Sequence, residues 1–536
     1  MIEEFYRGYL GISDPYSHQK EMWNEIIEGN FPLIVKVPTG SGKTEGVIAP
    51  FLYQFVENKF SIAPRLIYVL PMRVLSDSIS ERIKGYAERL SKDISVTAHH
   101  GGAPNDPFFI EDIVVTTLDQ FIYGYARASD QVGHHLDIPT GAIASSIVVF
   151  DEAHMYRDGF TFSIMRAIFE ILYHTGIPFV VMTATMPESL KESLFENIGG
   201  VHEIISTDFN LNNQIDISIE EESIYKDNEV NISEDILEVI QNKKTLVVLN
   251  QVKRAQKVYE EIKNRLSLKG GKEIVLLHSR FTRKDRKEHE NDALSILPHK
   301  KSGKIIIPEG AGVVISTQVL EVGMDFSTEL LLTELAPADA LMQRAGRCAR
   351  YENEKGQMII FPVENYLPYE KDHLKDTVRW LEGNGDFNIN NLFEVFKFVN
   401  ILDYKADDYA ARDSLIDLCE SVLYADLRPQ NIQVREGKPV NLFVVDFAKG
   451  EGKKKEERIR DAIMKTKYKE NSVTIDIKTA WGLVKKGIHL FEWDWSKEKS
   501  TEREKEGAIV PFKTYILESN NYDLEIGIKN DGLSII

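Results

Sequence analysis

The sequence has few cysteines, no long apolar run and an excess of acidic residues. Only two cysteines occur in 536 residues, Cys348 and Cys419, so neither a disulfide scaffold nor a four-thiolate zinc site can form, and a reducing cytoplasm is the expected setting. No uninterrupted apolar run approaches ~18 residues, so a membrane-spanning helix and a membrane partner are not expected. Residues 1–10 include Glu3 and Glu4 and lack an apolar core, which is not the pattern of a signal peptide.

Basic residues are in the minority. Lys and Arg number 64 against 83 Asp and Glu, which gives a formal net charge of −19. This balance argues against a protein coated in nucleic acid, although a local basic groove stays compatible with it, because a phosphate responds to nearby charges. Residues 449–470 contain nine basic and five acidic side chains, a local net charge of +4. Two interpretations stay open for this segment, a solvated loop with a surface helix and a loop that follows phosphates.

Short apolar runs alternate with longer segments of helical spacing through the first two thirds of the chain. Runs without polar alternation are typical of parallel strands covered by helices on both faces. The alternation predicts an α/β fold with two consecutive parallel-sheet domains. The predicted strands are 33–37, 66–70, 113–115, 147–150 and 179–182 in the first domain, and 245–249, 274–277, 313–315, 330–332 and 358–361 in the second.

The domain boundaries follow from changes in composition. The polar stretch 207–233 is the expected join between the two α/β domains. After Pro362 aromatic and polar residues mix, which predicts a third, smaller domain in the C-terminal part of the chain. We therefore expect domains over residues 1–206, 207–365 and 366–536, in accord with roughly one domain per 150 residues.

A glycine-rich loop follows the first apolar run. Residues 37–44 read Val-Pro-Thr-Gly-Ser-Gly-Lys-Thr and precede a segment of helical spacing. Glycines at such a turn let backbone N–H groups face a phosphate, and the helix N-terminus adds partial positive charge. Lys43 is expected to reach the β- and γ-phosphates, and Thr44 to offer its hydroxyl to Mg²⁺. The predicted ATP-binding residues of the loop are Pro38, Thr39, Gly40, Ser41, Gly42, Lys43 and Thr44.

Two carboxylates follow the run 147–150, within the segment Asp151-Glu152-Ala153-His154. A carboxylate at the C-terminal end of a parallel strand faces the crevice where α/β folds bind ligands. Asp151 is expected to hold Mg²⁺ through its water shell, and Glu152 to orient or deprotonate the attacking water. In isolation paired acids at a strand end are more often solvated turn residues, but behind a phosphate-binding loop they indicate a nucleotide site. A simple local hydrogen bond is an open alternative for His154.

Arginines cluster in the second α/β domain. Residues 343–350 read Gln-Arg-Ala-Gly-Arg-Cys-Ala-Arg, and the three-residue spacing of Arg347 and Arg350 predicts that they share one side of a helical turn. A planar guanidinium suits bidentate contact with a γ-phosphate and its developing charge. Such arginine fingers on a second lobe would make hydrolysis depend on lobe closure. A surface helix that forms salt bridges is the alternative. Gln343, in the same segment, is also a predicted catalytic residue.

In their order along the chain these motifs resemble those of superfamily 2 helicases. The resemblance covers residues 14–365 and implies two tandem RecA-like parallel-sheet domains plus a smaller C-terminal accessory domain, with ATP and Mg²⁺ as cofactors. The detailed sequences of several motifs are similar to those of the CRISPR-associated helicase of type I interference systems. The residues that carry it are Gln19, 38–44, 70–73, 116–120, 151–154, 183–185, 277–281, 285–286, 316–325 and 343–350.

The resemblance also implies roles for single residues. Tyr16 and Gln19 would contact adenine, and Gly323 and Asp325 would also contact ATP. Coupling of the ATP state to the DNA path is assigned to His154, Thr183 and Thr185. The residues assigned to contact with the strand backbone are Arg73, Thr117, Gln120, Arg280 and Thr317. These residue types suit phosphate and sugar recognition, which positions a strand without reading its sequence. For Thr117 and Thr317 a helix-capping role is the alternative.

Many members of that family carry an HD-type metal nuclease before the helicase lobes. Here a short segment precedes Pro15, and none of the 13 histidines is followed by Asp. The resemblance then implies a stand-alone helicase subunit that moves 3′ to 5′ on single-stranded or R-loop DNA, with a guide-RNA surveillance complex and a separate HD-type nuclease subunit as partners. Two alternatives stay open, an RNA helicase with a DEAH box and a nucleotide-gated nucleic-acid clamp.

Overall fold

Eight strands of the N-terminal part of the chain form one sheet, in the order β4-β3-β5-β2-β6-β7-β1-β8. All neighbouring strands run parallel except β3 and β4. The strands are β1 (Leu33–Lys36), β2 (Arg65–Leu70), β3 (Val96–His100), β4 (Ala103–Pro104), β5 (Ile113–Thr117), β6 (Ser146–Phe150), β7 (Phe179–Thr183) and β8 (His202–Ile205). This computed structural model describes residues 1–38, 40–71, 73–90, 92–101, 103–156, 159–205, 213–301, 304–320, 324–385, 387–389, 391–404, 409–422, 432, 438–448, 454–494, 496–503 and 505–529.

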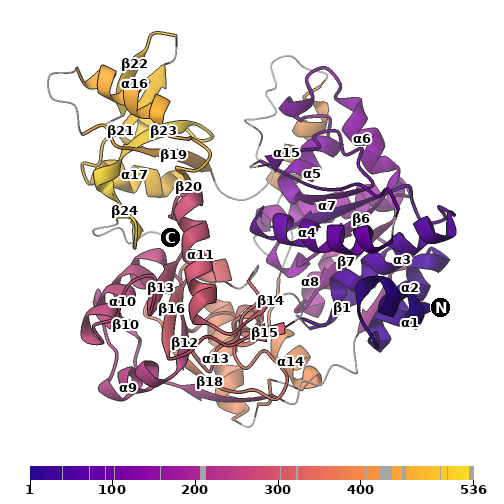
Figure 1. Cartoon of the computed structure of the whole chain (residues 1–536), viewed down its shortest axis with the longest axis horizontal. Coiled ribbons are helices and arrows are strands. Elements are labelled where there is room, and N and C mark those ends of the chain that lie inside the picture. Colours follow the sequence, from indigo (N-terminus) through magenta and orange to yellow (C-terminus); the bar gives the residue numbers. More distant parts are fainter. Residues whose placement is uncertain are drawn as a thin grey trace. The chain divides into compact units, whose positions relative to one another are not determined.

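Helices cover this sheet, and its central strands are buried on both faces, as the continuous apolar runs predict (Figure 1). On one face Phe121, Phe169 and Leu190 pack with Val148 and Val181 of the sheet in one apolar core. The helices of this part are α1 (Ile2–Phe5), α2 (Ser17–Glu28), α3 (Lys43–Glu57), α4 (Arg73–Arg89), α5 (Leu118–Tyr125), α6 (Asp137–Ala144), α7 (Gly159–His174) and α8 (Glu188–Leu194).

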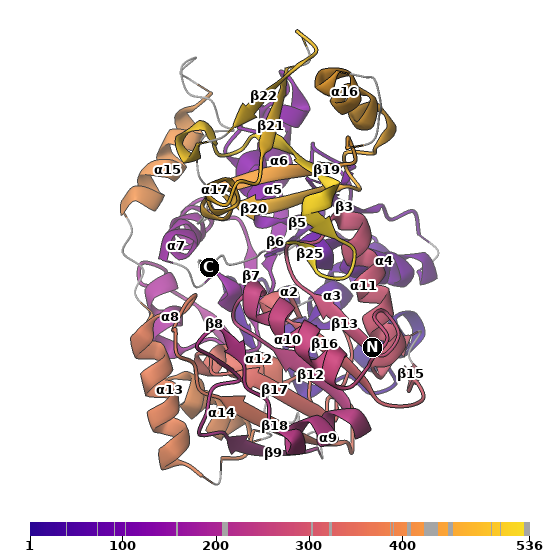
Figure 2. The same cartoon turned by 90° about the vertical axis from the view of Figure 1, so that its left-hand side faces the viewer.

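A second sheet of six parallel strands follows, in the order β13-β16-β12-β17-β18-β9. Figure 2 shows these strands with the helices that accompany them. The strands are β9 (Gln214–Ile219), β12 (Lys244–Val248), β13 (Ile274–Leu277), β16 (Gly312–Ser316), β17 (Leu330–Glu334) and β18 (Lys355–Phe361), and the helices are α9 (Glu234–Asn242), α10 (Val252–Arg265), α11 (Arg283–Ile296), α12 (Ala338–Ala345) and α13 (Lys371–Gly383). The predicted α/β class with two RecA-like parallel sheets is therefore confirmed, as are all ten predicted strands.

The C-terminal part contains two kinds of structure. Helices α14 (Leu392–Val399) and α15 (Tyr409–Glu420) come first, and Ala411, Leu415 and Leu418 of α15 belong to the apolar core around α7. A five-stranded mixed sheet follows, in the order β20-β19-β23-β21-β22. Its elements are β19 (Pro439–Val445), α16 (Lys455–Lys465), β20 (Ser472–Asp476), α17 (Ile477–Lys485), β21 (Leu490–Asp494), β22 (Lys499–Arg503) and β23 (Thr514–Glu518), after which β24 (Tyr522–Asp523) and β25 (Gly527–Ile528) form a hairpin.

The chain forms two compact units, Met1–Asn210 with Leu392–Glu436 and Leu211–Asn391 with Gly437–Ile536. Residues of the expected accessory domain are thus shared between both units, and the stretch expected as a join contains β9, an edge strand of the second sheet. The boundaries at 206/207 and 365/366 stay a proposal. Within the described part of the chain, no helix has the length and apolarity needed to cross a bilayer.

Candidate functional site

The glycine-rich loop leads from β1 into α3, so its predicted strand–loop–helix setting is confirmed. Gly40 and Gly42 have positive φ angles of 84° and 76°, and a Cβ at Gly42 would collide with the side-chain amide of Gln19. Position 42 therefore needs glycine for its conformation and for space. The Lys43 Nζ donates to the carbonyl oxygens of Val37 and Pro38, at 3.2 Å each. Thr39 lies outside the described residues.

The start of α2 lies against this loop. Gln19 accepts a hydrogen bond from the backbone N–H of Tyr16 (3.0 Å) and donates from Nε2 to the carbonyl oxygen of Gly42 (2.9 Å). His18 bonds the carbonyl oxygen of Ser41 at 2.9 Å, and its ring stacks on that of Tyr16. Tyr16 is 42% exposed. The two residues assigned to adenine are therefore joined to the phosphate-binding loop, together with His18, which the sequence motifs did not single out.

The two predicted Mg²⁺ ligands lie on opposite sides of one buried phenol. The Tyr68 hydroxyl donates to Oδ2 of Asp151 (2.6 Å) and lies 3.2 Å from Oγ1 of Thr44. The Arg82 Nη2 donates to the same Thr44 oxygen at 2.6 Å. Burial raises the pKa of Asp151 to about 6, and the nearby Glu152 adds to this increase. A hydroxyl and a carboxylate are oxygen donors that Mg²⁺ prefers, so the residues present fit this ion.

The sequence missed Tyr68 and Arg82. Tyr68 lies inside the apolar run 66–70, where a tyrosine is an ordinary strand residue. Arg82 lies within the amphipathic helix α4, where an arginine is an ordinary surface residue. A hydroxyl-bearing residue two positions before the end of a buried strand was the available signal, because polar groups in such strands need a partner.

The acidic segment is connected to β7 by a hydrogen-bonded chain. His154 is buried, and its Nδ1 lies 2.9 Å from Oγ1 of Thr183 and 3.7 Å from Oε2 of Glu152. The Thr183 hydroxyl also accepts from the backbone N–H of Thr185 at 3.3 Å. Glu152 itself has a left-handed backbone, with φ of 53°. The structure thus brings the three predicted coupling residues together beside the predicted water-activating carboxylate.

The predicted arginine fingers lie beyond a helix rather than on one. Helix α12 ends at Ala345, and Ala349 has a positive φ of 45°, so the prediction that Arg347 and Arg350 share a helical turn is wrong. The helix ends at its C-cap Gly346, before Arg347, and the left-handed residue Ala349 turns the chain between Arg347 and Arg350. The Arg347 Nη1 donates to the carbonyl oxygen of Met324 at 2.7 Å.

Arg350 forms an ion pair with Asp325, with 2.7 Å between Nε and Oδ1. Burial opposes ionisation of Asp325, but the charges of Arg350 and Arg347 outweigh it and lower the pKa of that carboxyl. Arg347 and Arg350 therefore both contact the segment that contains Met324 and Asp325. Gln343 is buried on α12, and Gly323 lies outside the described residues.

Arg344, the first arginine of the cluster, has a structural role. Its guanidinium is buried and donates to Thr333, to Asn250 and to the Tyr369 hydroxyl at 2.8–2.9 Å. Beside it Arg254 pairs with buried Glu334 at 2.7 Å. These bonds connect α12 to the carboxyl end of β17 and so hold the start of the segment that contains Arg347 and Arg350.

In the first unit, the residues predicted to contact a strand backbone lie after β2 and β5. Thr117 is the last residue of β5 and is buried, and its side chain makes no capping hydrogen bond to α5. Gln120 lies on the first turn of α5 and accepts from Nε2 of Gln131 at 3.2 Å. Arg73 is the first residue of α4, and its side chain lies outside the described part of the structure.

In the second unit, the corresponding residues lie after β13 and β16. Thr317 is buried, and its backbone N–H donates to the carbonyl oxygen of Leu277 at 3.3 Å. Arg280 is 5% exposed, and burial lowers the pKa of its guanidinium to about 10. Its backbone N–H donates to Nδ1 of His278 at 3.1 Å, and His278 stacks on Phe281. Because β13 and β16 are parallel neighbours, these residues share one edge of the sheet.

Comparison with known proteins assigns two domains. Residues 16–193 match the DEAD/DEAH box helicase family, and residues 241–353 match the family described as CRISPR-associated nuclease/helicase Cas3, C-terminal. These two matches contain the phosphate-binding loop, the acidic segment and the arginine segment.

Curated relatives and solved structures agree with these matches. The chain is 31% identical over 375 residues to the CRISPR-associated helicase Cas3 of Thermoproteus tenax, covering 67% of this chain and 61% of that one. It is 29% identical over 405 residues to the putative CRISPR-associated nuclease/helicase Cas3 of Methanocaldococcus jannaschii, covering 69% of this chain and 52% of that one. The crystal structure of T. fusca Cas3-ADP has a similar fold, with a TM-score of 0.65, 19% identity and coverage of 88% and 65%. The chain thus spans between half and two thirds of the length of these relatives.

Proposed function

Because the chain contains a DEAD/DEAH box helicase domain and a Cas3-like C-terminal helicase domain, we propose that it couples ATP hydrolysis to movement along DNA in a CRISPR system. The arrangement of Lys43, Thr44, Asp151 and Glu152 supports this proposal most directly. These residues come from the carboxyl ends of β1 and β6 of one parallel sheet, and Tyr68 connects two of them. Open α/β sheets bind nucleotides at that edge.

The residues divide the work of hydrolysis. The Lys43 ammonium would bind the β- and γ-phosphates, and Tyr16 and Gln19 would bind the adenine ring. Glu152 would accept a proton from the attacking water, and Arg347 or Arg350 would bind the charge that develops on the γ-phosphate. Mg²⁺ held by Thr44 and Asp151 would neutralise phosphate charge. His154, Thr183 and Thr185 would transmit the state of the site to the nucleic-acid contacts.

The finer parts of the proposal concern the track and the partners. We propose 3′-to-5′ movement on single-stranded or R-loop DNA, recruitment by a guide-RNA surveillance complex, a nuclease on a separate chain and a cytoplasmic location. Two folds similar to this chain come from structures described as a CRISPR RNA-guided surveillance complex, pre-nicking (TM-score 0.59), and as the DUF1998 helicase MrfA bound to DNA (TM-score 0.61). Both cysteines are free thiols, which suits a reducing compartment.

Lys43→Ala tests the proposal at its centre. We expect the variant to lose ATP turnover, because the substitution removes the ammonium group that would bind the phosphates. We expect it to fold normally, because the substitution leaves the apolar core unchanged. The measurement is steady-state ATPase activity with single-stranded DNA, single-stranded RNA of the same sequence, or neither. Stimulation by DNA alone supports the proposal, and stimulation by RNA alone supports an RNA helicase. Near-native turnover by folded Lys43→Ala would contradict the site.

A further inference from the structure

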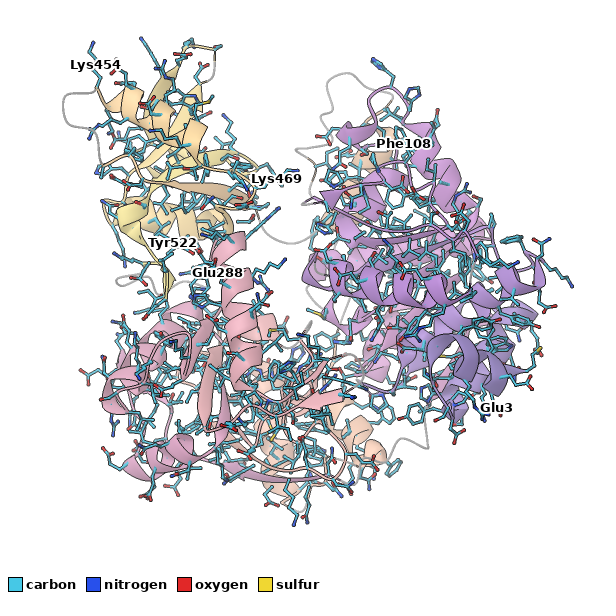
Figure 3. The ribbon with its side chains drawn as sticks, in the orientation of Figure 1. Glu3, Phe108, Glu288, Lys454, Lys469 and Tyr522 are labelled. Atoms are coloured by element: carbon cyan, nitrogen blue, oxygen red, sulfur yellow. The ribbon has the colours of Figure 1, made fainter. Side chains whose placement is uncertain are left out.

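The C-terminal hairpin of the described chain, residues 522–528, lies on the loop that follows β13. In Figure 3 its Tyr522 is labelled near Glu288 of α11, which begins just after that loop. The loop contains His278 and Arg280, the latter a predicted contact to the strand backbone. Both segments belong to the same compact unit. Residues more than two hundred positions apart in sequence therefore form one local structure.

Main-chain and side-chain hydrogen bonds connect the hairpin to the loop. The backbone N–H of Ile528 donates to the carbonyl oxygen of Arg280 at 3.2 Å, and Nε2 of His278 lies 3.0 Å from the carbonyl oxygen of Ile526. Gln256 of α10 donates to the carbonyl oxygens of both hairpin residues, at 2.6 and 3.0 Å. The backbone at Arg280 is thus bonded to the hairpin, and the hairpin in turn to α10.

Tyr522 holds the far end of the same loop. Its hydroxyl donates to Oδ2 of Asp285 at 2.6 Å and accepts from the backbone N–H of Thr282 at 3.0 Å. Thr282 is the N-cap of α11 and accepts from the backbone N–H of Asp285. The Tyr522 hydroxyl therefore bonds both the N-cap residue Thr282 and Asp285 in the first turn of α11.

Gly527 makes the close approach possible. Its φ is +74°, and a Cβ at this position would lie 2.7 Å from the carbonyl oxygen of Arg280 and 2.9 Å from Cε1 of His278. Both distances are too short for a real side chain. The hairpin backbone therefore packs directly on the loop, which glycine alone permits.

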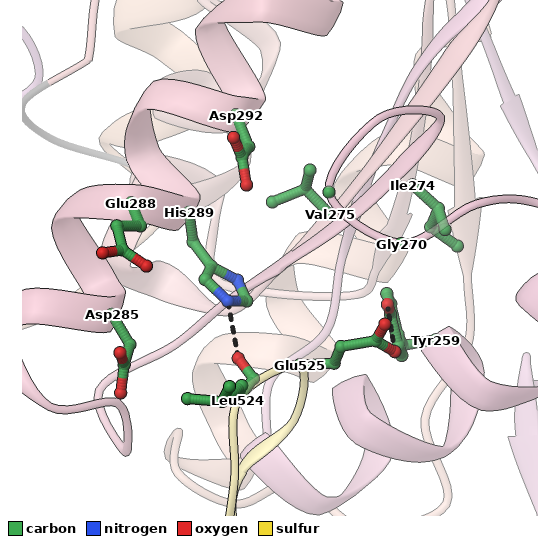
Figure 4. Close-up of a pocket in the computed structure, with 11 residues that line it drawn as sticks. Tyr259, Gly270, Ile274, Val275, Asp285, Glu288, His289, Asp292, Leu524 and Glu525 are labelled. Carbon is green, nitrogen blue, oxygen red and sulfur yellow. Dashed lines mark hydrogen bonds between the residues drawn. The ribbon is translucent and has the colours of Figure 1, made fainter.

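The hairpin tip is anchored separately. The ring of His289 on α11 bonds the carbonyl oxygen of Leu524 at 2.8 Å, and Glu525 accepts from the Tyr259 hydroxyl at 3.2 Å and pairs with Lys263 of α10. Figure 4 shows the contacts of His289 with Leu524 and of Tyr259 with Glu525 beside a cavity of about 170 Å³, which the tip, α10 and α11 help to line. The hairpin thus bridges two helices and spans the loop between β13 and α11.

We propose that residues 522–528 act as a clamp that fixes the loop 278–282 and so positions Arg280 for contact with the nucleic-acid backbone. The inference rests on the proposed function, since it deepens the role of that loop. Arg280 is only 5% exposed, so the position of its loop backbone determines whether the side chain can meet a strand at all. A loop held in its binding conformation avoids the entropic cost of ordering upon binding. Arg280 is then a binding residue, and Gly527 and Tyr522 are positioning residues.

Gly527→Ala tests the clamp, and Gly487→Ala is its matched control. Both glycines have positive φ, +74° and +80°, but a Cβ at Gly487 meets nothing within 4 Å. Both alanines therefore carry the same backbone strain, and only that at 527 pushes the hairpin off the loop. We expect Gly527→Ala to weaken binding of a labelled single-stranded oligonucleotide by about tenfold, as measured by fluorescence anisotropy. Gly487→Ala should bind like the wild type, and both variants should keep the wild-type KM for ATP.

Two further variants show whether the effect passes through Arg280. Tyr522→Phe keeps the ring and removes the hydroxyl, and should weaken DNA binding by about threefold with an unchanged melting temperature. In an Arg280→Ala background, Gly527→Ala should add little further loss, because both changes act on one interaction. Equal DNA binding by Gly527→Ala and Gly487→Ala, tighter binding by Gly527→Ala, or fully additive losses would each overturn the clamp. If the wild-type chain bound no single-stranded nucleic acid, the proposed function would fail instead.

Discussion

At the scale of single residues, the two carboxylates Asp151 and Glu152 are held differently. Glu152 is the less fixed of the two side chains. Its backbone is left-handed at φ 53°, and 17% of its side chain is exposed. Among the described residues its Oε2 has no hydrogen-bond partner, and Nδ1 of His154 lies 3.7 Å from it. Asp151, in contrast, accepts from Tyr68 and from the backbone N–H of Glu152. One carboxylate is thus held in place while the other keeps an oxygen for a further partner.

Glu152→Gln should separate binding from hydrolysis. We expect ATP to bind with nearly unchanged affinity, because Asp151 and Lys43 are retained, while turnover falls by about 10²-fold or more through loss of the base. Fluorescent-nucleotide binding measures the first quantity and phosphate release the second. Loss of ATP binding together with turnover would instead assign Glu152 a structural or metal-holding role.

The two arginines should differ when each is replaced by alanine. Arg350 is paired with the half-exposed Asp325, whereas Arg347 is 6% exposed and bonded to a backbone carbonyl. If Arg350 is a finger, Arg350→Ala should lower kcat by about 10³-fold at unchanged melting temperature. Arg347→Ala should lower both kcat and the melting temperature, since it leaves a buried carbonyl without its donor. Losses of kcat below about tenfold in both variants would favour a purely salt-bridging segment.

Residue-level prediction from sequence succeeded where a motif has a fixed local geometry. The loop 37–44 needs only its neighbours to turn correctly, so Lys43 and Thr44 could be placed from sequence alone. Tyr68 and Arg82 reach Thr44 from β2 and α4, and such contacts depend on how separate elements pack. The expectation that Arg347 and Arg350 share a helical turn was wrong for a different reason, because three-residue spacing indicates a shared face only while the helix continues.

At the scale of elements, the strands with a continuous apolar run were predictable, including β13 at the edge of the second sheet, and the strands without such a run were not. All ten continuous apolar runs became parallel strands. β3 reads Val-Thr-Ala-His-His, and its two histidines are buried only because the sheet and its helices surround them. β9 alternates polar and apolar residues within a stretch that looked like a linker, and it pairs only with β18 at the sheet edge. A strand with a solvent-facing side carries polar residues on that side, so its apolar signal is weak.

The loop after β13 makes stability depend on pH. Burial lowers the pKa of His278 to about 3, and the nearby Arg280 adds to this decrease. The folded state therefore binds this proton less well than the unfolded chain, whose histidine pKa is near 6.5. The contribution to stability is complete above about pH 6.5 and is lost progressively as pH falls towards 3. At pH 5 the loss is about 2 kcal/mol.

His278→Asn should remove this dependence. The variant is expected to be less stable than the wild type at pH 7, but its free energy of unfolding should fall by about 2 kcal/mol less between pH 7 and pH 5. Urea unfolding at several pH values measures this slope, with exposed His134 replaced by Asn as the control. Parallel slopes for all three proteins would show that His278 does not stay neutral in the folded state.

At the scale of the whole molecule, the net charge opposes DNA binding, but the local charge at the predicted contacts does not. A net charge of −19 does not favour DNA, yet the predicted strand contacts come from parallel-strand ends of two sheets, where few charges suffice. Segment 449–470, left open between two interpretations, contains α16 from Lys455 to Lys465, and its Arg460 pairs with Glu498. The described part of the segment therefore contains a largely exposed helix with salt bridges, in accord with the first interpretation.

The purified chain is predicted to unwind DNA without cutting it. Cleavage of phosphodiesters usually needs metals held by several convergent carboxylates or histidines, and we assign the donor pair Thr44 and Asp151 to the proposed nucleotide site. His99 and His100 are neighbours on β3, and adjacent strand residues point to opposite faces. The ring of His100 bonds Asp77 at 3.0 Å, and that of His99 packs on Phe109.

The measurement is incubation of long single-stranded DNA with the protein, ATP and Mg²⁺, Mn²⁺, Co²⁺ or Ni²⁺, beside a fluorescent unwinding assay on a duplex with a 3′ overhang. We expect strand separation that requires ATP and disappears in Lys43→Ala, and intact single strands throughout. Degradation that co-purifies with the chain, persists in Lys43→Ala without ATP and vanishes on substitution of His99 and His100 would place a nuclease on this chain. Cleavage that begins only when a separate HD-type nuclease is added would support a division of labour, in which this chain supplies movement and its partner the cut.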